Sequence, residues 1–309
     1  MKLAIVFPGQ GSQKIAMMQG FAGNSAVRNT FADAAAVLGE DLWRLIENGP
    51  ADQLNATINT QPVMLTAAYA MYRAWLASGG PAPELMAGHS LGEYTALTAA
   101  GALAFDAALP LVRFRAQAMQ DAVPLGVGAM AVIIGLDAES VRAVCEQAAQ
   151  GEVVEAVNFN DPAQVVIAGL KTAVERACME AKARGAKRAL PLPVSAPFHS
   201  SLLRPAAERL RTRLDSISIR TPAIAVIHNV DVLAHSDPAE IREALARQAA
   251  SPVRWVETVQ KMAAEGVTHV VEVGPGKVLQ GLVKRIAPEL TALAVTDADS
   301  LASTLEVLS

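Results

Sequence analysis

The pentapeptide Gly88-His89-Ser90-Leu91-Gly92 carries the residue types that nucleophilic acyl chemistry needs. It fits G-x-S-x-G, in which a serine stands on a strained turn between a strand and a helix and the flanking glycines let neighbouring backbone approach. The Ser90 hydroxyl then projects into a cleft at the helix N-terminus, where the Leu91 amide can donate to a developing oxyanion. A helix-capping serine is the alternative. A short apolar strand pattern before the motif and a helical pattern after it favour a nucleophile.

A serine nucleophile needs a base, which is usually histidine. His199 is the candidate, because it lies in a loop between a predicted strand and a predicted helix, where bases are commonly held. A histidine on a surface loop is the alternative. The other four are less suited: His89 should point away from its neighbour, His228 ends a strand, His269 lies inside one, and His235 lies in a turn that we expect to be solvated.

The order of the candidates departs from the usual hydrolase order of serine, acid and late histidine. No acid between Ser90 and His199 stands out as a third member, so we expect a dyad in which a backbone carbonyl orients the histidine. The HGGG-type oxyanion motif is also missing. The turn Gly9-Gln10-Gly11 could supply a second amide donor, although such a turn is more often only a turn.

Composition sets the frame for this chemistry. The 309 residues are 52% apolar and only 18% charged, against about 25% charged in ordinary domains, which excludes a mainly disordered chain. A net charge of −4 gives no global attraction to nucleic acid or anionic membranes. Two cysteines are too few for a disulfide framework or a zinc site and favour a reduced cytoplasmic setting. The apolar runs 3–7 and 122–136 are too short for a signal peptide or a membrane span.

The elements that must position these residues alternate between strands and helices, which predicts an α/β fold with a parallel sheet. This large catalytic core covers 1–125 and 196–309, with strands at 2–7, 84–88, 223–228, 268–273 and 291–295 and helices at 25–38, 61–76, 94–101, 107–123, 204–214, 238–248, 253–265 and 277–286. Residues 126–195 follow the order βαββαβ and predict an inserted ferredoxin-like subdomain. Its strands are expected at 128–135, 153–159, 164–169 and 186–192, with a turn at 160–162 and helices at 137–149 and 171–184.

Five ordered segments together resemble the acyltransferase family, and within it the malonyl-CoA:acyl-carrier-protein transacylases of bacterial type II fatty acid synthesis. They run from Phe7 to Gln13, from Gly88 to Tyr94, from Asn158 to Asn160, from Pro197 to Ser200 and from Glu272 to Leu279. The resemblance extends from Phe7 to about Leu293, nearly the whole chain. It implies a hydrolase-like α/β core with a ferredoxin-like subdomain, in agreement with the pattern of elements.

The resemblance also implies roles for individual residues. Ser90 would carry the acyl group and His199 would act as its base. The amides of Gln10 and Leu91 would hold the oxyanion. Gln248, which precedes Pro252-Val253-Arg254-Trp255, would orient the histidine through a carbonyl.

The family that the chain resembles places an arginine in the helix after the motif, where it pairs with the free carboxylate of the malonyl group and separates a malonyl transferase from a hydrolase; Arg115 matches it. Guanidinium grips carboxylate in a bidentate fork that lysine cannot reproduce. Arg113 and Arg115 are two residues apart and point to different faces of a helix, so only one can face the cleft. The alternative is that either arginine only covers a helix face. A buried arginine would also exclude uncharged acyl chains.

The implied function is a ping-pong transfer of malonyl from malonyl-CoA to the phosphopantetheine thiol of acyl-carrier protein, with no cofactor and no metal, by a monomer. A malonyl transacylase for another carrier, in malonate decarboxylase or polyketide assembly, remains an alternative. A serine esterase or a non-enzymatic binding module fits less well. Because the carrier is expected to be acidic, it should dock on a local basic cluster, either 182–188 or Lys277 with Lys284 and Arg285.

Two departures from the family pattern leave loop geometry open. Lys14-Ile15-Ala16 stands where valine and glycine are common, and His228 stands where asparagine is common. Gly274-Pro275-Gly276-Lys277 lacks the P-loop pattern and is expected to be a structural turn. Cys145 and Cys178 are expected to pack in the small subdomain.

Overall fold

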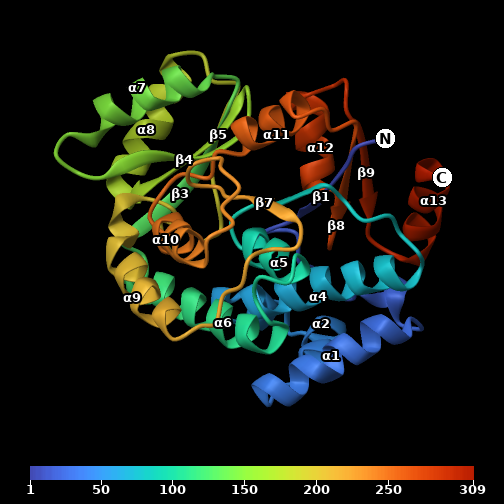
Figure 1. The fold of residues 1–309 in the computed structure, drawn as a ribbon. Helices are drawn as coiled ribbons and strands as arrows, with labels where there is room; N and C mark the ends of the chain where they lie inside the picture. The colour runs from blue at the N-terminus through green and yellow to red at the C-terminus, as the bar shows by residue number, and fades with distance from the viewer.

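Five parallel strands form the central sheet in the computed structural model, which describes residues 1–309. Their order is β7 (Ala225–Ile227), β2 (Leu85–Gly88), β1 (Leu3–Phe7), β8 (His269–Val273) and β9 (Thr291–Val295). All neighbours pair in parallel. The carboxyl ends of parallel strands meet at one edge of a sheet, the usual place for a site in open α/β folds. β1 lies between β2 and β8, so the loops after these three strands are neighbours (Figure 1).

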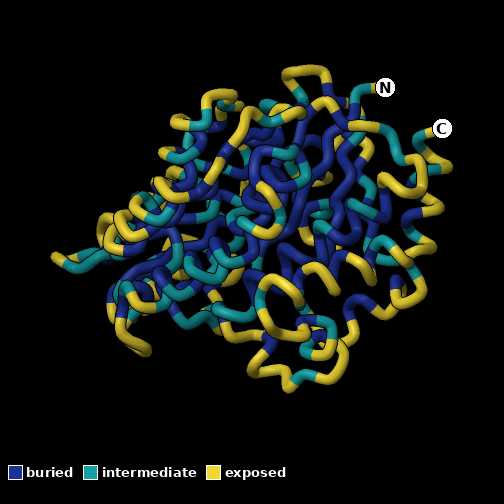
Figure 2. Tube along the Cα trace, turned by 60° about the horizontal axis from the view of Figure 1, so that its bottom comes forward, coloured by how far each residue is buried: buried dark blue, intermediate teal, exposed yellow.

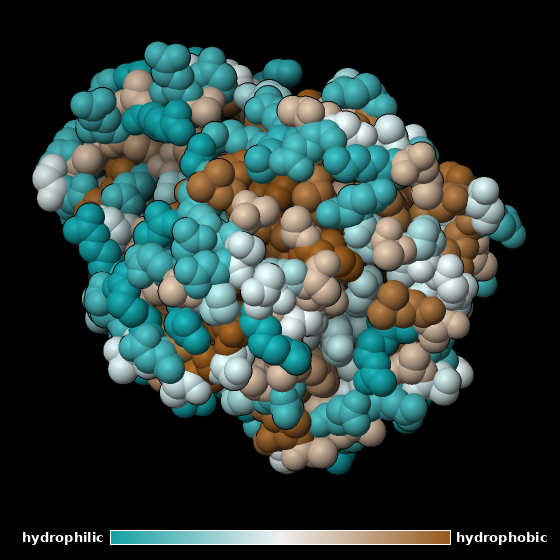
Figure 3. All heavy atoms as spheres, in the orientation of Figure 1, coloured by the Kyte–Doolittle hydropathy of each residue, from teal (hydrophilic) through white to brown (hydrophobic).

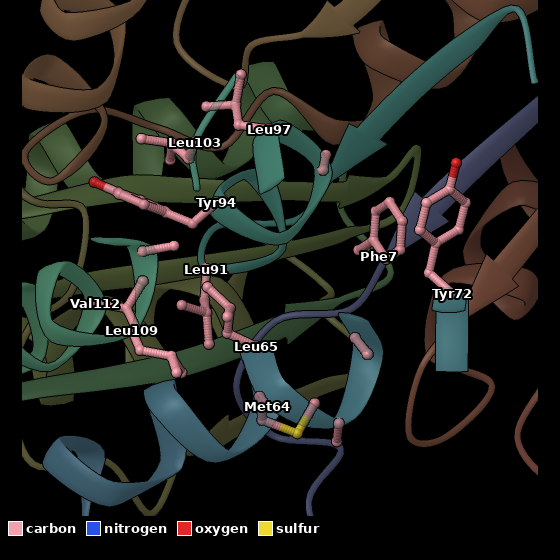
Figure 4. Close-up of a cluster of buried hydrophobic side chains, with 14 of the residues drawn as sticks. Phe7, Met64, Leu65, Tyr72, Leu91, Tyr94, Leu97, Leu103, Leu109 and Val112 are labelled. Atoms are coloured by element: carbon pink, nitrogen blue, oxygen red, sulfur yellow. The ribbon is translucent and has the colours of Figure 1, made fainter. Parts of the chain in front are cut away.

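The continuous apolar run in β1 arises because both faces of the sheet are covered. Leu3, Ile5 and Phe7 face the larger core, while Ala4 and Val6 face a smaller one. The larger core contains residues of α1 (Ser25–Leu38), α4 (Thr57–Ala77), α5 (Gly92–Ala99), α6 (Phe105–Asp121), α9 (Arg204–Asp215) and α10 (Pro238–Gln248). The smaller core contains residues of α11 (Trp255–Ala264) and α12 (Val278–Ile286). Figure 4 shows part of the larger core, and Figure 2 shows the buried interior beneath an exposed rim.

Several helix boundaries differ from the sequence prediction. α4 begins at Thr57, four residues before the start at residue 61 that the apolar spacing predicts. Pro62, a residue typical of a first helical turn, therefore lies inside this helix. Most of α4 is buried, so its burial rather than a single apolar stripe holds it. α2 (Leu42–Asn48), α3 (Ala51–Asn55) and α13 (Ala298–Leu308) are not predicted; the first two are too short for a clear periodic pattern. No helix is long and apolar enough to cross a membrane.

The small subdomain follows the predicted order, with strands β3 (Gly128–Ile134), β4 (Val154–Asp161), β5 (Gln164–Leu170) and β6 (Arg188–Pro191). They form an antiparallel sheet in the order β4-β5-β3-β6. α7 (Ala138–Ala149) and α8 (Lys171–Ala183) cover one face of it, and the outer surface over them is mainly hydrophilic (Figure 3). The predicted turn at 160–162 is wrong by two residues, because β4 continues to Asp161 and pairs with Gln164. The boundaries 126 and 195 stay a prediction.

Contacts across the junction hold the subdomain on the large core. In β4, Phe159 donates its backbone N–H to the Val253 carbonyl (3.0 Å), and Val253 donates to the Val157 carbonyl (2.8 Å). Arg285 of α12 donates to Asp161 at 2.7 Å. The second face of the small sheet, with Met130 and Val166, faces the carboxyl edge of the large sheet across a cleft that Gln10 and His89 line from the other side.

Candidate active site

The turn between β2 and α5 holds Ser90 at φ +53°, a left-handed conformation that costs roughly 1–2 kcal/mol outside glycine. Asn229 holds this turn: its Oδ1 accepts from the Ser90 N–H (2.7 Å) and its Nδ2 donates to the Gly88 carbonyl (2.7 Å). The flanking glycines are steric requirements. A Cβ on Gly88 would lie 1.9 Å from Gly92 C, and one on Gly92 would lie 2.1 Å from Phe7 O.

Ser90 and His199 are in hydrogen-bond contact, with 2.7 Å between Oγ and Nε2. The other ring nitrogen, Nδ1, donates to the backbone carbonyl of Gln248 at 2.9 Å. Gln248 is the last residue of α10, where carbonyls have no partner within the helix and are free to accept. With Nδ1 protonated, Nε2 is left as an acceptor for the serine proton. No carboxylate contacts the ring, so the geometry is that of the predicted dyad.

Burial is the main cause that lowers the pKa of His199 to about 3, and the neighbouring charge of Arg115 lowers it further. Hydrogen bonding to the Gln248 carbonyl opposes this shift. The imidazole is consequently neutral across the physiological pH range, as a proton acceptor must be.

Arg115 lies in α6 with 1% of its surface exposed and points at the nucleophile. Its Nη1 donates to Gln61 Oε1 (2.9 Å), and its Nη2 donates to Gln248 Oε1 (2.9 Å) and to Ser90 Oγ (3.2 Å). No carboxylate contacts this guanidinium, whose pKa is lowered by burial. Arg113 forms an ion pair with Glu40 at the surface, so Arg115 is the arginine of the cleft.

The amides of Gln10 and Leu91 have no hydrogen-bond acceptor within the chain. Both belong to loops at the carboxyl edge, after β1 and β2, next to Ser90. The Gln10 loop is pressed against the serine turn, since a Cβ on Gly9 would lie 2.6 Å from the His89 carbonyl oxygen. The Gln10 side chain donates to Thr57 Oγ1 at 3.1 Å and holds the loop from the other side. Two free donors beside a nucleophile are the arrangement that an oxyanion requires.

Sequence analysis missed three residues that support this site: Gln61, Glu93 and Asn229. Each is buried or nearly so and works through partners far away in the sequence. Glu93 is fully buried and accepts from His228 Nδ1 (2.7 Å), the Asn229 N–H (2.9 Å) and Gln248 Nε2 (2.9 Å). The signal that could have found Glu93 is a carboxylate in an otherwise apolar first turn after the serine motif.

The two departures from the family pattern are both accommodated. Ala16 adopts φ +61°, a conformation that favours glycine, and its N–H donates to the Ile46 carbonyl at 2.8 Å. His228 donates to Glu93 from Nδ1, an atom bonded to Cγ just as Nδ2 of an asparagine would be. His235 is not solvated as expected, because it contacts Asp231 and Glu240 and its side chain is only 14% exposed. His89 turns away from Ser90, toward Asn160 Oδ1 (2.8 Å).

A pocket of about 130 Å³ opens in front of Ser90, with Arg115 and His199 in its wall. A cavity of about 150 Å³ holds a six-carbon ring, so the pocket suits an acyl group of about six non-hydrogen atoms. A second pocket of about 270 Å³ shares Gln10 and His89 with the first and continues past Leu282 of α12. No group of three or more His, Cys, Asp or Glu side chains is arranged to hold a metal ion.

Comparison with known proteins gives a consistent result. The acyl transferase domain family matches residues 4–302. Malonyl CoA-acyl carrier protein transacylase of Escherichia coli K12 is 54% identical over 99% of both chains, and that of Bacillus subtilis is 45% identical over 99% of this chain and 97% of its own. The crystal structure of acyl-carrier-protein S-malonyltransferase from Burkholderia pseudomallei has a TM-score of 0.98 at 63% identity, covering 99% of this chain and all of that one. A malonyl-transacylase in complex with a type II PKS acyl-carrier protein has a TM-score of 0.98 at 52% identity, with the same coverage.

Proposed function

The chain belongs to the acyl transferase domain family, and we propose that it transfers the malonyl group of malonyl-CoA to the phosphopantetheine thiol of acyl-carrier protein. Transfer runs through a malonyl ester on Ser90, so that donor and acceptor react in turn at one site. The names of the transacylase relatives support this activity. One observation carries the malonyl assignment. The Arg115 guanidinium is buried, its Nη2 lies 3.2 Å from Ser90 Oγ, and no carboxylate of the chain contacts it.

In the first half-reaction, Ser90 Oγ bonds to the thioester carbonyl carbon while its proton passes to His199 Nε2. The amides of Gln10 and Leu91 donate to the oxyanion; loss of one such donor costs about 3–4 kcal/mol in comparable sites. The C–S bond then breaks, and His199 returns the proton to the sulfur of CoA. In the second half, the pantetheine thiol gives its proton to His199 as the sulfur attacks the carbonyl carbon of the malonyl ester. The C–O bond to Ser90 then breaks, and His199 returns the proton to Ser90 Oγ.

Arg115 selects the acyl group because it forms a bidentate pair with the free malonyl carboxylate. An uncharged acyl chain would leave the guanidinium buried and unpaired, which is costly. The carboxylate also acts on the base. Burial is the larger cause of the lowered pKa of His199, and the charge of Arg115 is the next largest. A malonyl carboxylate offsets that charge and strengthens the base when the correct acyl group is bound.

The carrier-protein surface is proposed from the second pocket, which gives the pantetheine arm a route to Ser90. Its lining includes Val132 and Leu282. Leu190 pairs with Val132, and Arg188 pairs with Ile134, so Arg188 belongs to the same face of the small sheet. We expect reversal of Lys187 and Arg188 to glutamate to raise the KM for carrier protein while malonyl loading is unchanged. An unchanged KM would remove this patch and leave Lys277, Lys284 and Arg285.

The central experiment incubates the chain with malonyl-CoA and measures intact mass. A malonyl adduct is expected, and Ser90→Ala should abolish it; an adduct that survives this change contradicts the nucleophile. Arg115→Ala should weaken malonyl loading far more than acetyl loading, and equal losses contradict the carboxylate clamp. The same variant should move the acid limb of acetyl loading to higher pH, because removing the charge raises the pKa of His199.

The identity of the carrier is a separate question. A structure 52% identical to this chain holds a type II PKS acyl-carrier protein, which keeps a polyketide carrier as a second candidate acceptor. Transfer rates to purified fatty-acid and polyketide carriers, measured side by side, decide between them.

The setting of the enzyme is part of the proposal. We propose that the enzyme acts as a monomer, because one chain supplies every residue assigned to the site. Light scattering of the purified chain measures the oligomeric state. Each step is assigned to a side chain or an amide, so the proposed reaction uses no cofactor.

We also propose that the enzyme works in the reducing cytoplasm, because its two cysteines, buried Cys145 and half-buried Cys178, are both free.

A further inference from the structure

Beneath the nucleophile turn lies a buried carboxylate that the proposed reaction does not use. Glu93 is in the first turn of α5 and has no exposed surface. Its Oε1 accepts from His228 Nδ1 at 2.7 Å. Its Oε2 accepts from the Asn229 N–H and from Gln248 Nε2, both at 2.9 Å. A buried carboxylate with three donors is an organised part of the site, because an unsatisfied buried charge is costly.

The Gln248 side chain connects this carboxylate to Arg115. Its Nε2 donates to Glu93, and its Oε1 accepts from Arg115 Nη2 at 2.9 Å. An ionised carboxylate accepts hydrogen bonds only, so it determines which end of the amide faces it. Gln248 Nε2 also donates to the Ser90 carbonyl at 2.9 Å. Without the charge of Glu93, only that carbonyl would keep the amide from turning over and presenting its NH₂ group to the guanidinium, where two donors would oppose each other.

The same carboxylate also balances the charge of Arg115. Burial lowers the pKa of Arg115, and the negative charge of Glu93 works in the opposite direction. The two ions are separated by the Gln248 amide and form no direct ion pair. The guanidinium thus stays charged while two of its donors remain able to change partners when a substrate carboxylate arrives.

His228 holds the Glu93 carboxylate through one hydrogen bond to Oε1. It is fully buried, and its Nε2 has no hydrogen-bond partner, so the Nδ1–H donated to Glu93 is the only hydrogen bond of the ring. An apolar side chain at this position would leave Glu93 Oε1 without a donor. A shorter amide would not, because Nδ2 of an asparagine is bonded to the same carbon as Nδ1 of a histidine.

We propose that Glu93 and His228 are positioning residues that set Arg115 for carboxylated acyl groups, so that specificity for malonyl over acetyl depends on a carboxylate that never touches substrate. This rests on the proposed function, in which Arg115 binds the malonyl carboxylate. The His199 ring is oriented by a different group of Gln248, its backbone carbonyl. The Ser90 carbonyl still accepts from Gln248 Nε2 at 2.9 Å when Glu93 is changed. Damage to the Glu93 arm should therefore affect malonyl more than acetyl.

The experiment measures the ratio of the malonyl to the acetyl loading rate in one enzyme preparation. Because both rates are proportional to the amount of folded enzyme, the ratio does not depend on the folded fraction. Glu93→Gln should lower the ratio about tenfold, the scale of a hydrogen bond to a charged group. His228→Leu should lower it about threefold, and His228→Asn should preserve it. Glu272→Gln, which removes an equally buried carboxylate elsewhere, is the matched control and should leave the ratio unchanged.

The outcomes separate this proposal from the proposed function. Arg115→Ala is the reference: a ratio that does not fall in this variant overturns the clamp itself. If the ratio falls in Arg115→Ala while Glu93→Gln and His228→Leu lose both activities equally, the clamp stands and the positioning role is overturned. If Glu93→Gln does not fold, the pair His228→Leu and His228→Asn decides, and equal ratios in these two variants overturn it.

Discussion

Two turns at the same edge of the sheet, on either side of β1, solve one backbone problem differently. After β2, the chain passes through Ser90 at φ +53° into α5; after β8, it passes through Gly276 at φ +88° into α12. The second turn uses a residue without a side chain and avoids the strain. The first keeps a serine in a conformation that favours glycine and needs Asn229 to hold it. Strain is retained where a hydroxyl must be presented and is absent where the chain only has to turn.

The turn after β8 has a supporting part in the site. A Cβ on Gly274 would lie 2.6 Å from the ring of Pro8, so this turn packs against the loop that carries Gln10. That loop is pressed between both turns, and Gln10 lines the same pocket as Ser90. The Gly274–Lys277 segment is therefore a structural turn, as predicted, and it supports the loop that carries Gln10.

A buried carboxylate accompanies each turn, and the two differ in their partners. Both oxygens of Glu93 accept hydrogen bonds. Glu272 accepts at Oε2 from the Gln280 N–H of α12 at 2.7 Å, while its buried Oε1 has no partner. Burial raises the pKa of Glu272 to about 7. Of the two buried carboxylates, only the one next to the Ser90 turn has hydrogen-bond donors on both of its oxygens.

The largest contrast is expected in catalysis. Ser90→Ala should reduce malonyl transfer by about 10⁴-fold or more, the scale of losing a nucleophile. Gly276→Ala should reduce the transfer rate per folded molecule far less, because Gly276 contacts no reacting group and only supports the loop that carries Gln10. Transfer assays normalised to folded protein measure both. A loss in Gly276→Ala as large as that in Ser90→Ala would show that the second turn takes part in the chemistry.

The next contrast is the pH dependence of stability at Glu272. Its pKa is raised in the folded state to about 7, above its ordinary value of 4.5. The folded chain therefore holds this proton more tightly, and the associated stability is present below pH 4.5 and is lost as the pH rises through 7. Glu272→Gln removes the effect and should gain up to about 3 kcal/mol relative to the wild type between pH 5 and pH 8. Denaturant unfolding at both values measures the gain; a constant difference contradicts it.

Stability should also fall when the second turn loses its glycine. Gly276→Ala places a Cβ at φ +88° and 3.1 Å from Ser12 Cβ, so a loss of roughly 1–2 kcal/mol is expected. Gly281→Ala is the control, since Gly281 lies in α12 and its nearest neighbour is the flexible end of Arg285 at 3.5 Å. Equal stabilities of the two variants would show that the turn is not constrained.

The smallest effect should appear at the strained turn. Ser90→Gly and Ser90→Ala both remove the hydroxyl, but only glycine relieves the left-handed conformation. Ser90→Gly should be the more stable of the two by about 1 kcal/mol, the cost of that conformation less the flexibility of glycine in the unfolded chain. The midpoint of denaturant unfolding measures both variants. A higher midpoint for Ser90→Ala than for Ser90→Gly would mean that the turn stores no strain.

Prediction from sequence succeeded where short-range patterns carry the information. The α/β class and the βαββαβ order follow from the periodicity of single segments, and Ser90 follows from a motif with local steric demands. His199 was a candidate from its position in a loop after a strand, and Arg115 required the family resemblance, because nothing local connects them to Ser90, 109 and 25 residues away. The short helices α2 and α3 and the end of β4 were missed because their patterns are brief or conform to a turn.

By itself, the sequence determined which elements form and which residue types are available for acyl transfer, because helix and strand periods and glycine sterics act over a few residues. Only the tertiary structure decided that the Arg115 guanidinium has amide partners and no carboxylate, and that the Gln248 side chain joins it to the buried carboxylate of Glu93. Burial and proximity arise when segments more than one hundred residues apart pack together, as Gln248 does against Arg115 and Ser90. These two properties give the charges and hydrogen bonds of the site their strength.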